Sequence, residues 1–233
     1  ISDPAVDAIF NFRGGFGNAQ LLEEIDYDLI SKHPKVIMGY SDVTALLIAI
    51  YTKTGLITYH GPMPKTGISK REENYIQKLF IKGKKITYQN DKEHPIQTIT
   101  KGTASGILIG GNLSVITSLL GSEYLPDWTG KVLFIEDVGE EVYKIDRMLT
   151  QLKLAGVLDK VNGVIVGQFT ATTRKATGSP TLEKVLIDHL KPLGVPVYMN
   201  AQIGHISDQF ILPVGGNITM DATMGRLILN KNK

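Results

Sequence analysis

Residues 35–55, KVIMGYSDVTALLIAIYTKTG, constrain the fold of this chain more than any other stretch of its sequence. The apolar run Val36–Met38 predicts a short buried strand, and apolar residues at helical spacing over 42–52 predict a helix. Gly55 is typical of the residue that follows the end of such a helix. Ser41 is therefore expected on a tight turn between a strand and a helix.

Two interpretations fit Ser41. A strand–serine–helix turn is the geometry of a nucleophile elbow, which pushes a serine hydroxyl out from the backbone. The following helix would direct its N–H groups and its positive dipole end at charge that forms there. However, serine is also a preferred helix N-cap, and the stretch lacks the second glycine of G-x-S-x-G. On this stretch alone, capping is the better supported interpretation.

The residues on either side continue an alternation of strands and helices. Residues 6–12, VDAIFNF, and 56–59 predict strands, and residues 18–25 predict a helix. Strands that alternate with helices indicate a parallel, doubly wound α/β sheet. Ligands of such sheets bind at the carboxyl ends of the strands.

Three features of the sequence are expected at that edge of the sheet: the Gly14-Gly15 turn within RGGFG, Ser41, and His60. Paired glycines let a ligand approach backbone amides closely. Their spacing does not match the dinucleotide-binding fingerprint G-x-G-x-x-G. The turn is therefore a candidate binding element without an assigned ligand.

The sequence changes character at about residue 67 and predicts two domains. Residues 67–101 are polar and lysine-rich, with one amphipathic helix over 72–81, and we interpret them as a connecting segment. The predicted fold class is α/β, with an N-terminal doubly wound parallel-sheet domain over 1–66 and a C-terminal β-rich α/β domain over 102–233. In the second domain we expect strands over 131–135, 161–169 and 195–200, helices over 143–158 and 182–190, and β-hairpins turning at Gly215–Gly216 and Met224–Gly225.

Composition excludes several classes of function. The formal net charge is +2, which gives no electrostatic footprint for nucleic acid. The chain has no cysteine, so it has no disulfide, thiolate nucleophile or thiolate metal site. No apolar run approaches the length of a membrane span. The five histidines have no metal-ligand spacing, so no metal is expected.

A catalytic serine needs a base and a group that orients the base. His60 and His205 are the candidate bases, because each follows a predicted strand and lies next to a glycine. Glu136 ends a strongly apolar strand, where a carboxylate must face a cleft or be hydrogen-bonded. A nearby lysine or arginine is an alternative partner for Glu136. The residues alone therefore define an α/β protein with a candidate serine site.

Six motifs occur in an order that resembles the LD-carboxypeptidase family of serine peptidases, S66. They are RGGFG, KVIMGYSDVTAL, HGPM, GGNLSV, LFIEDVGEEVYKIDRMLTQL and GHISDQFILPVG. The resemblance implies a Ser-Glu-His triad that falls on Ser41, Glu136 and His205. It also implies that the site lies at the interface of the two domains.

The resemblance implies a reaction in which Ser41 attacks a peptide carbonyl while His205 removes its proton and Glu136 orients the imidazole. The backbone N–H groups of Asp42 and of the Gly14-Gly15 turn would hold the oxyanion. The implied substrate is a murein tetrapeptide, cleaved before its C-terminal D-amino acid during cytoplasmic cell-wall recycling. No cofactor is implied. The partners implied are this muropeptide and a second copy of the chain, as a homodimer, without nucleic acid or membrane.

Two other functions stay open. Microcin C-type immunity peptidases resemble this chain and cleave an aminoacyl-nucleotide amide. Such a nucleotide usually stacks on an aromatic ring. Tyr88 is the only aromatic residue over 82–102, and Trp128 lies in a turn where packing is expected, so we predict the murein substrate. The second alternative is a non-catalytic nucleotide- or peptide-binding module in which Ser41 is a helix cap.

The N-terminus departs from the family pattern. Members of the family begin with elements before the residue that matches Ile1. A doubly wound sheet without its first elements would expose an apolar edge. We therefore expect further residues before Ile1, packed beside the strand at 6–12.

Overall fold

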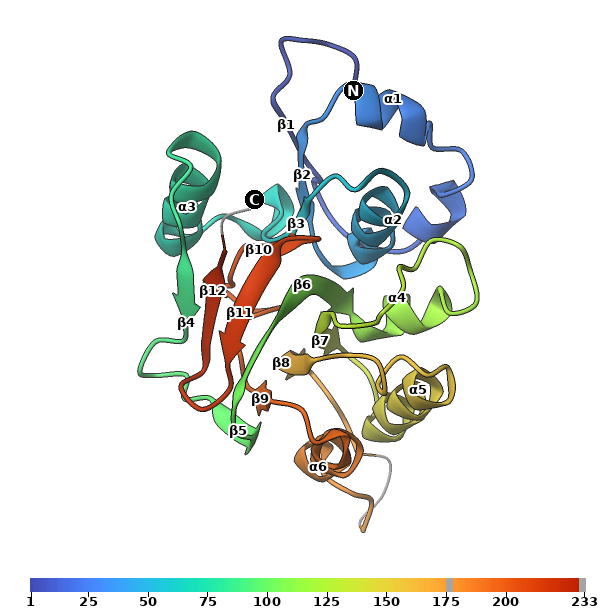
Figure 1. Ribbon diagram of the computed structural model, residues 1–233, viewed down its shortest axis with the longest axis vertical. Helices are drawn as coiled ribbons and strands as arrows, with labels where there is room; N and C mark the ends of the chain where they lie inside the picture. The colour runs from blue at the N-terminus through green and yellow to red at the C-terminus, as the bar shows by residue number, and fades with distance from the viewer. Residues whose placement is uncertain (175–177, 231–233) are drawn as a thin grey trace.

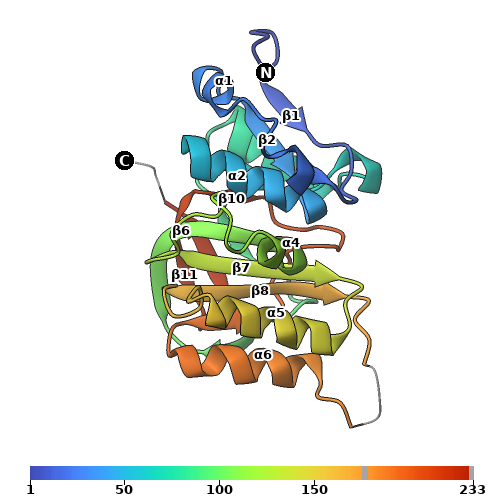
Figure 2. The ribbon, with the colours of Figure 1, turned by 90° about the vertical axis from the view of Figure 1, so that its right-hand side faces the viewer.

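A computed structural model describes residues 1–174 and 178–230, and its strands form a smaller and a larger sheet (Figures 1 and 2). The smaller sheet has the order β1-β2-β3-β10. Strands β1, β2 and β3 are parallel, and β10 is antiparallel to β3. The bounds of these strands are β1 Ala8–Phe10, β2 Val36–Gly39, β3 Thr58–His60 and β10 Leu212–Val214.

The larger sheet has the order β4-β12-β11-β6-β7-β8-β9-β5. Strands β6 to β9 are parallel, and the strands outside them pair antiparallel. The first six residues of β7 are buried, as is typical of a parallel strand covered on both faces. The strands are β4 Thr87–Gln89, β5 Gln97–Thr100, β6 Thr103–Asn112, β7 Val132–Val138, β8 Gly163–Thr170, β9 Val197–Met199, β11 Asn217–Asp221 and β12 Arg226–Leu229.

Helices α4, α5 and α6 lie along the same side of the parallel strands of the larger sheet (Figure 2). In α5 the buried residues recur at helical spacing on the side that faces the core. The α-helices are α1 Tyr27–Lys32, α2 Thr44–Thr54, α3 Lys70–Ile76, α4 Leu113–Ser118, α5 Val142–Leu154 and α6 Leu182–Leu190. Shorter helical turns are η1 Asn18–Leu21, η2 Ser41–Val43, η3 Pro64–Thr66, η4 Gln77–Ile81 and η5 Lys191–Leu193.

Helix α2 joins the two parts of the molecule at its N-terminal end. The hydroxyl of Thr44 accepts a hydrogen bond of 3.1 Å from the backbone N–H of Asn112, at the end of β6. A Cβ at Gly111 would lie 2.5 Å from the Thr44 hydroxyl oxygen, so only glycine permits this approach. Asn112 is in register with Glu136 of β7. The serine turn that precedes α2 is therefore fixed beside the C-terminal end of β7.

The structure confirms the predicted α/β class and the parallel strands that surround the serine turn. Three local predictions differ. The helix predicted at 18–25 is only the short turn η1, and the helix predicted at 42–52 begins as η2. The hairpin predicted at Gly215–Gly216 is wrong, because β10 and β11 belong to different sheets. The hairpin at Met224–Gly225 is confirmed by the antiparallel pair β11 and β12.

The predicted domain ranges stay a prediction, but strand pairing crosses them. Residues 67–101, expected as a connecting segment, contribute β4 and β5 to the larger sheet. Conversely, β10 comes from the C-terminal part of the chain and completes the smaller sheet. Among the described residues, no helix combines the length and the apolar character needed to cross a bilayer.

Candidate active site

Ser41 lies on a sharp turn at the carboxyl end of β2. Tyr40 is extended, whereas Ser41 has φ 62°, in the left-handed region. This conformation is costly for a residue with a side chain and is concentrated at functional sites. Ser41 does not cap the helix: Tyr40 and Val43 hold the cap positions of η2 and α2, and neither cap has a side-chain hydrogen bond. The hydroxyl of Ser41 is directed to His205 instead.

His205 bridges Ser41 and Glu136. Its Nε2 lies 3.0 Å from the hydroxyl oxygen of Ser41, and its Nδ1 lies 2.7 Å from Oε2 of Glu136. With the imidazole proton on Nδ1, the ring donates to Glu136 and accepts from Ser41. These residues come from β2–η2, the loop before β10, and β7. The structure thus brings together the three residues that the family resemblance implied.

Glu136 is fully buried, at 0% exposed. Its ion pair among the described residues is with His205, and not with the lysine or arginine considered from sequence. Its other oxygen, Oε1, has no hydrogen-bond partner within residues 1–174 and 178–230. The pairing of β7 with β8 shifts register between Ile135 and Asp137, so Glu136 lies at an irregularity of the sheet. Bulges of this kind redirect side chains near active sites.

His60, the other candidate base, has no hydrogen bond to Ser41, and neither of its ring nitrogens has a partner among the described residues. The Tyr40 ring packs edge-on against His205, with centroids 4.9 Å apart, and against His60 at 6.0 Å. His60 is fully buried and also packs on Phe134. Burial lowers its pKa from 6.5 to about 4. His60 is therefore a neutral packing residue at pH 7 beneath the site.

The Gly14-Gly15 turn lies against Ser41. A Cβ at Gly14 would lie 2.9 Å from the Cβ of Ser41 and 3.6 Å from the backbone nitrogen of Asp42. The Asp42 carboxylate accepts hydrogen bonds from the backbone N–H of Asn18, at 3.0 Å, and from its side chain, at 2.6 Å. Asp42 thus ties the glycine-rich turn to the serine turn. The three residues expected to line an oxyanion site lie beside the serine.

Sequence reasoning missed Asp137, which is buried next to Glu136. Asp137 accepts hydrogen bonds from the Asn112 side chain and from the backbone N–H groups of Ser114 and Val138. Burial raises its pKa to about 6 despite these bonds. Asn112 is the residue that could have drawn attention to this region in the sequence, because an asparagine between a strand and a helix is a typical N-cap. Its side chain caps α4 and also holds Asp137.

Two cavities adjoin the Ser41–His205 contact, one lined by His205 and the other by Ser41. Neither lining contains a lysine or an arginine among the described residues. The cavity on the His205 side, of about 670 Å³, is lined by Tyr40, Thr66, Gly67, Ile68, Ser69, Glu72, His205, Ile206, Ser207 and Gln209. The cavity on the Ser41 side, of about 380 Å³, is lined by Gly15, Phe16, Ser41, Asp42, Asn112, Ser114, Val115, Ser118, Asp137, Val138 and Glu140.

The two aromatic residues considered from sequence as stacking platforms, Trp128 and Tyr88, are buried in the core. Trp128 is 5% exposed and belongs to the main hydrophobic core, as predicted from its turn. Tyr88 is fully buried, and its hydroxyl donates to the backbone oxygen of Ile211. Phe16 is different, because it is 96% exposed and lines the cavity on the Ser41 side. Sequence reasoning did not single out this ring.

The site has the arrangement of a serine hydrolase. It combines a strained serine turn at a sheet edge, a histidine in contact with the serine hydroxyl, and a buried carboxylate bonded to that histidine. Family models agree with this class. Residues 1–61 match the LD-carboxypeptidase N-terminal domain, and residues 105–220 match the LD-carboxypeptidase C-terminal domain.

Individual relatives are similar over nearly the whole chain. A probable murein peptide carboxypeptidase of Bacillus subtilis is 41% identical over 224 residues, which are 94% of this chain and 70% of that protein. The microcin C7 self-immunity protein MccF of Escherichia coli is 32% identical over 251 residues, with 95% and 73% covered. The crystal structure of muramoyltetrapeptide carboxypeptidase from Oxalobacter formigenes aligns with TM-score 0.86 and 26% identity, with 100% and 81% covered.

The chain belongs to the LD-carboxypeptidase family, S66. It is a hydrolase with carboxypeptidase function. The alternative of a non-catalytic binding module is therefore set aside.

Proposed function

We propose that this protein is a serine carboxypeptidase that hydrolyses the L,D-peptide bond before the C-terminal D-amino acid of murein tetrapeptides. The observation that carries the proposal is the hydrogen-bonded chain Ser41–His205–Glu136, with contacts of 3.0 and 2.7 Å, in a member of this family. A hydroxyl, an imidazole and a carboxylate in this order can activate a serine for acyl transfer.

In this mechanism the Ser41 oxygen attacks the peptide carbonyl carbon, and His205 Nε2 takes the hydroxyl proton. Glu136 stabilises the imidazolium that forms, while backbone N–H groups of Gly15 and Asp42 hold the oxyanion. His205 returns the proton to the leaving amine, so the carbon–nitrogen bond breaks and an acyl-enzyme remains. Water, deprotonated by His205, then hydrolyses the ester and restores the serine.

The two cavities suggest an orientation for the peptide. Asp42, Asp137 and Glu140 line the Ser41 side, where a substrate carboxylate would be repelled. The His205 side offers the hydroxyl groups of Ser69 and Ser207 as hydrogen-bond donors. The Glu72 carboxylate also lines this cavity, but its two oxygens are bonded to the backbone N–H groups of Ser69 and Gln209. We therefore place the terminal D-residue and its carboxylate on the His205 side. The donors of that cavity take the role of the cationic or N–H-rich pocket that the substrate requires.

The proposal is tested by incubating the protein with a murein tetrapeptide and detecting released D-alanine by mass spectrometry. The expected result is release of one D-alanine per peptide and a remaining tripeptide, with both products absent for Ser41→Ala. Release that persists in Ser41→Ala would contradict the serine mechanism. No release by the wild-type protein would contradict the substrate.

Peptide recycling in the cytoplasm and a homodimeric state are parts of the same proposal. They follow from the family resemblance and from a substrate that is a cell-wall fragment. Light scattering in solution checks the assembly: twice the mass of the monomer is expected. A monomeric protein would remove the homodimer from the proposal.

A second candidate function is cleavage of an aminoacyl-nucleotide amide, as the resemblance to microcin C-type immunity peptidases implies. The observation in its favour is Phe16, an exposed ring beside Ser41 that could stack on a base. Side-by-side kinetics on the tetrapeptide and an aminoacyl-sulfamoyl adenylate rank the two functions. A higher kcat/KM for the adenylate, reduced in Phe16→Ala and less so in Phe16→Tyr, would favour the second.

A further inference from the structure

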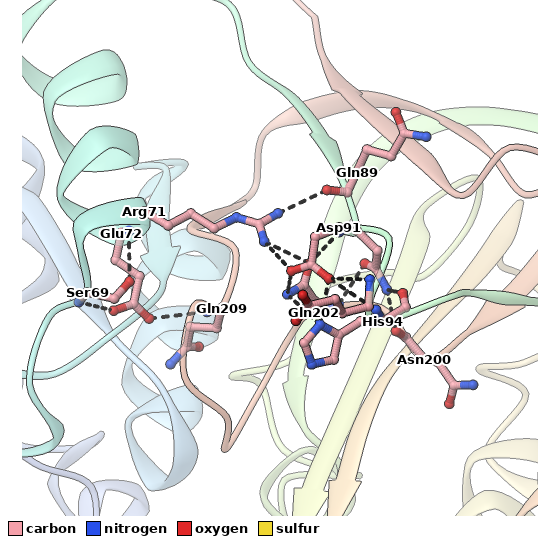
Figure 3. A network of polar contacts seen from close by, with 11 residues as sticks. Ser69, Arg71, Glu72, Gln89, Asp91, His94, Asn200, Gln202 and Gln209 are labelled. Carbon is pink, nitrogen blue, oxygen red and sulfur yellow. Dashed lines mark hydrogen bonds and ion pairs between the residues drawn. The ribbon is translucent and has the colours of Figure 1, made fainter.

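Helix α3 contacts the loop that carries His205, residues 200–209, at Gln202 and at Gln209 (Figure 3). Gln202 lies three positions before His205, and Gln209 lies four positions after it. Gln202 contacts Arg71, and Gln209 contacts Glu72. Two consecutive residues of one short helix thus hold the two ends of the histidine loop.

The contact before the histidine is a fully satisfied buried amide. Gln202 is 0% exposed, and its Oε1 accepts hydrogen bonds from Arg71, at 2.9 Å, and from the backbone N–H of Asp91, at 3.0 Å. Its Nε2 donates to the Asp91 carboxylate at 2.8 Å. Arg71 also contacts Asp91, at 3.0 Å, and the backbone oxygen of Gln89. A buried amide with both ends bonded has one position, because any other leaves a polar group unsatisfied.

The backbone of the loop is also bonded to the chain beyond β4. The side chain of Asn90 donates to the backbone oxygen of Asn200 at 2.7 Å. It also accepts from the backbone N–H of Gln202 at 3.0 Å. These bonds join the start of the loop to the residues that Arg71 contacts.

The contact after the histidine uses a carboxylate that also caps α3. Glu72 is 3% exposed, and its Oε2 accepts from the backbone N–H of Ser69 at 2.8 Å in a capping box. Its Oε1 accepts from the backbone N–H of Gln209 at 3.2 Å. Burial raises the pKa of Glu72. A capping box needs only the bond from Glu72 to the Ser69 N–H. The bond from Glu72 to the Gln209 N–H therefore serves the histidine loop.

The loop has a backbone conformation that needs such support. Asn200 and Asp208 have φ 67° and 60°, and Gly204 has φ 107°. Left-handed backbone at residues with a side chain persists only where the surrounding structure enforces it. Asp208 directly precedes Gln209, whose N–H is bonded to Glu72, and the backbone oxygen of Asn200 is bonded to the Asn90 side chain. The anchors therefore decide where His205 lies.

We propose that Arg71 and Glu72 are positioning residues, which act through the loop 200–209 to keep the imidazole of His205 in contact with Ser41 and Glu136. The inference rests on the proposed function, in which His205 is the base. The hydrogen bonds of Arg71 and Glu72 are to residues other than Ser41, His205 and Glu136, although Glu72 also lines the cavity on the His205 side. A misplacement of about 1 Å by a residue outside the chemistry can lower a rate by about a hundredfold.

The experiment compares Glu72→Ala, Glu72→Gln and the matched control Glu73→Gln. Glu73 is the next residue of the same helix, carries the same charge and is exposed. At a temperature where all variants are folded, we expect Glu72→Ala to lower kcat by about tenfold or more with KM changed by less than about threefold. Glu72→Gln keeps one carbonyl oxygen for the Gln209 N–H and should recover part of kcat. Glu73→Gln should match the wild type.

Two readouts do not depend on the peptide. One is the rate at which a fluorophosphonate modifies Ser41, and the other is the low-field proton resonance expected for the His205 Nδ1–H bonded to Glu136. We expect a slower reaction and a broadened or lost resonance in Glu72→Ala. If Glu72→Ala does not fold, Arg71→Met breaks the other anchor and is read in the same way.

A folded Glu72→Ala that keeps the wild-type resonance, reagent rate and kcat, and loses only thermal stability, would show that Glu72 is just a helix cap. That result would overturn the inference. A wild-type protein that is not modified by the fluorophosphonate and does not cleave the tetrapeptide would instead overturn the proposed function. In that case the resonance still decides whether Glu72 positions His205.

Discussion

Gly204 lies directly against Glu136, at a distance that excludes any side chain at residue 204. A Cβ there would lie 2.5 Å from Oε2 of Glu136, and the residue has φ 107°. The same oxygen is 2.7 Å from Nδ1 of His205. The missing side chain therefore lets the histidine loop approach closely enough for the next residue to reach the buried carboxylate.

Gly204→Ala should impair activity more than stability. The added methyl group must displace either the Glu136 carboxylate or the loop, and the backbone conformation is also strained. We expect kcat to fall by about a hundredfold and the free energy of unfolding to fall by about 1–3 kcal/mol. Urea unfolding and tetrapeptide kinetics on the same preparation measure both. A folded variant with wild-type kcat would show that the contact is not needed.

Ser41→Ala and His205→Ala should each lower kcat by about 10⁴-fold or more, without unfolding the protein. The double variant should be no worse than either single variant, because the side chains act as one unit. Circular dichroism checks the fold, and single-turnover kinetics measure the residual rate. Losses that multiply in the double variant would indicate that the two residues act independently.

Gly14→Ala tests the proposed oxyanion turn. Its Cβ would lie 2.9 Å from the Cβ of Ser41 and 3.1 Å from the hydroxyl oxygen, so the turn or the serine must move. We expect a loss of about a hundredfold in kcat, comparable to the loss of one oxyanion donor. The control is Gly17→Ala, which has φ 107° but would meet only the Gln20 side chain, at 3.9 Å. Gly14 itself does not have a positive φ, so equal losses in both variants would show that the contact with Ser41 is not the cause.

His60 should make the protein less stable in acid. Its pKa is lowered from 6.5 to about 4, so between these values the unfolded chain binds a proton that the folded protein excludes. The free energy of unfolding should therefore fall with pH below 6.5, by about 2 kcal/mol from this residue at pH 5. Above pH 6.5 the residue is neutral in both states and has no effect.

His60→Leu should remove this part of the acid sensitivity, because neither imidazole nitrogen has a hydrogen-bond partner in the described part of the chain. Urea unfolding at pH 7.5 and pH 5 measures it. The control is His33→Leu, at the C-terminal end of α1, which should keep the wild-type dependence. A His60→Leu variant that loses as much stability in acid as the wild type would contradict the buried neutral histidine.

Local patterns predicted the elements that carry the serine. The apolar run before Gly39 and the helical spacing after Ser41 correspond to β2 and α2, and Gly55 ends α2 with φ 73°. Sequence could not separate a nucleophile elbow from a helix cap at Ser41. That choice depends on the left-handed backbone of Ser41 and on the histidine that its hydroxyl contacts, neither of which is local information.

The sequence by itself determined the alternation of strands and helices, and its motifs determined the family, because spacing and residue order are properties of the chain. Only the tertiary structure decided which of His60 and His205 reaches Ser41, since both follow strands and flank glycines. His60 is buried against the Tyr40 ring, whereas His205 lies on a loop held by α3 and placed against Glu136 by Gly204. Contacts between residues up to 164 positions apart make that decision, and no local pattern encodes them.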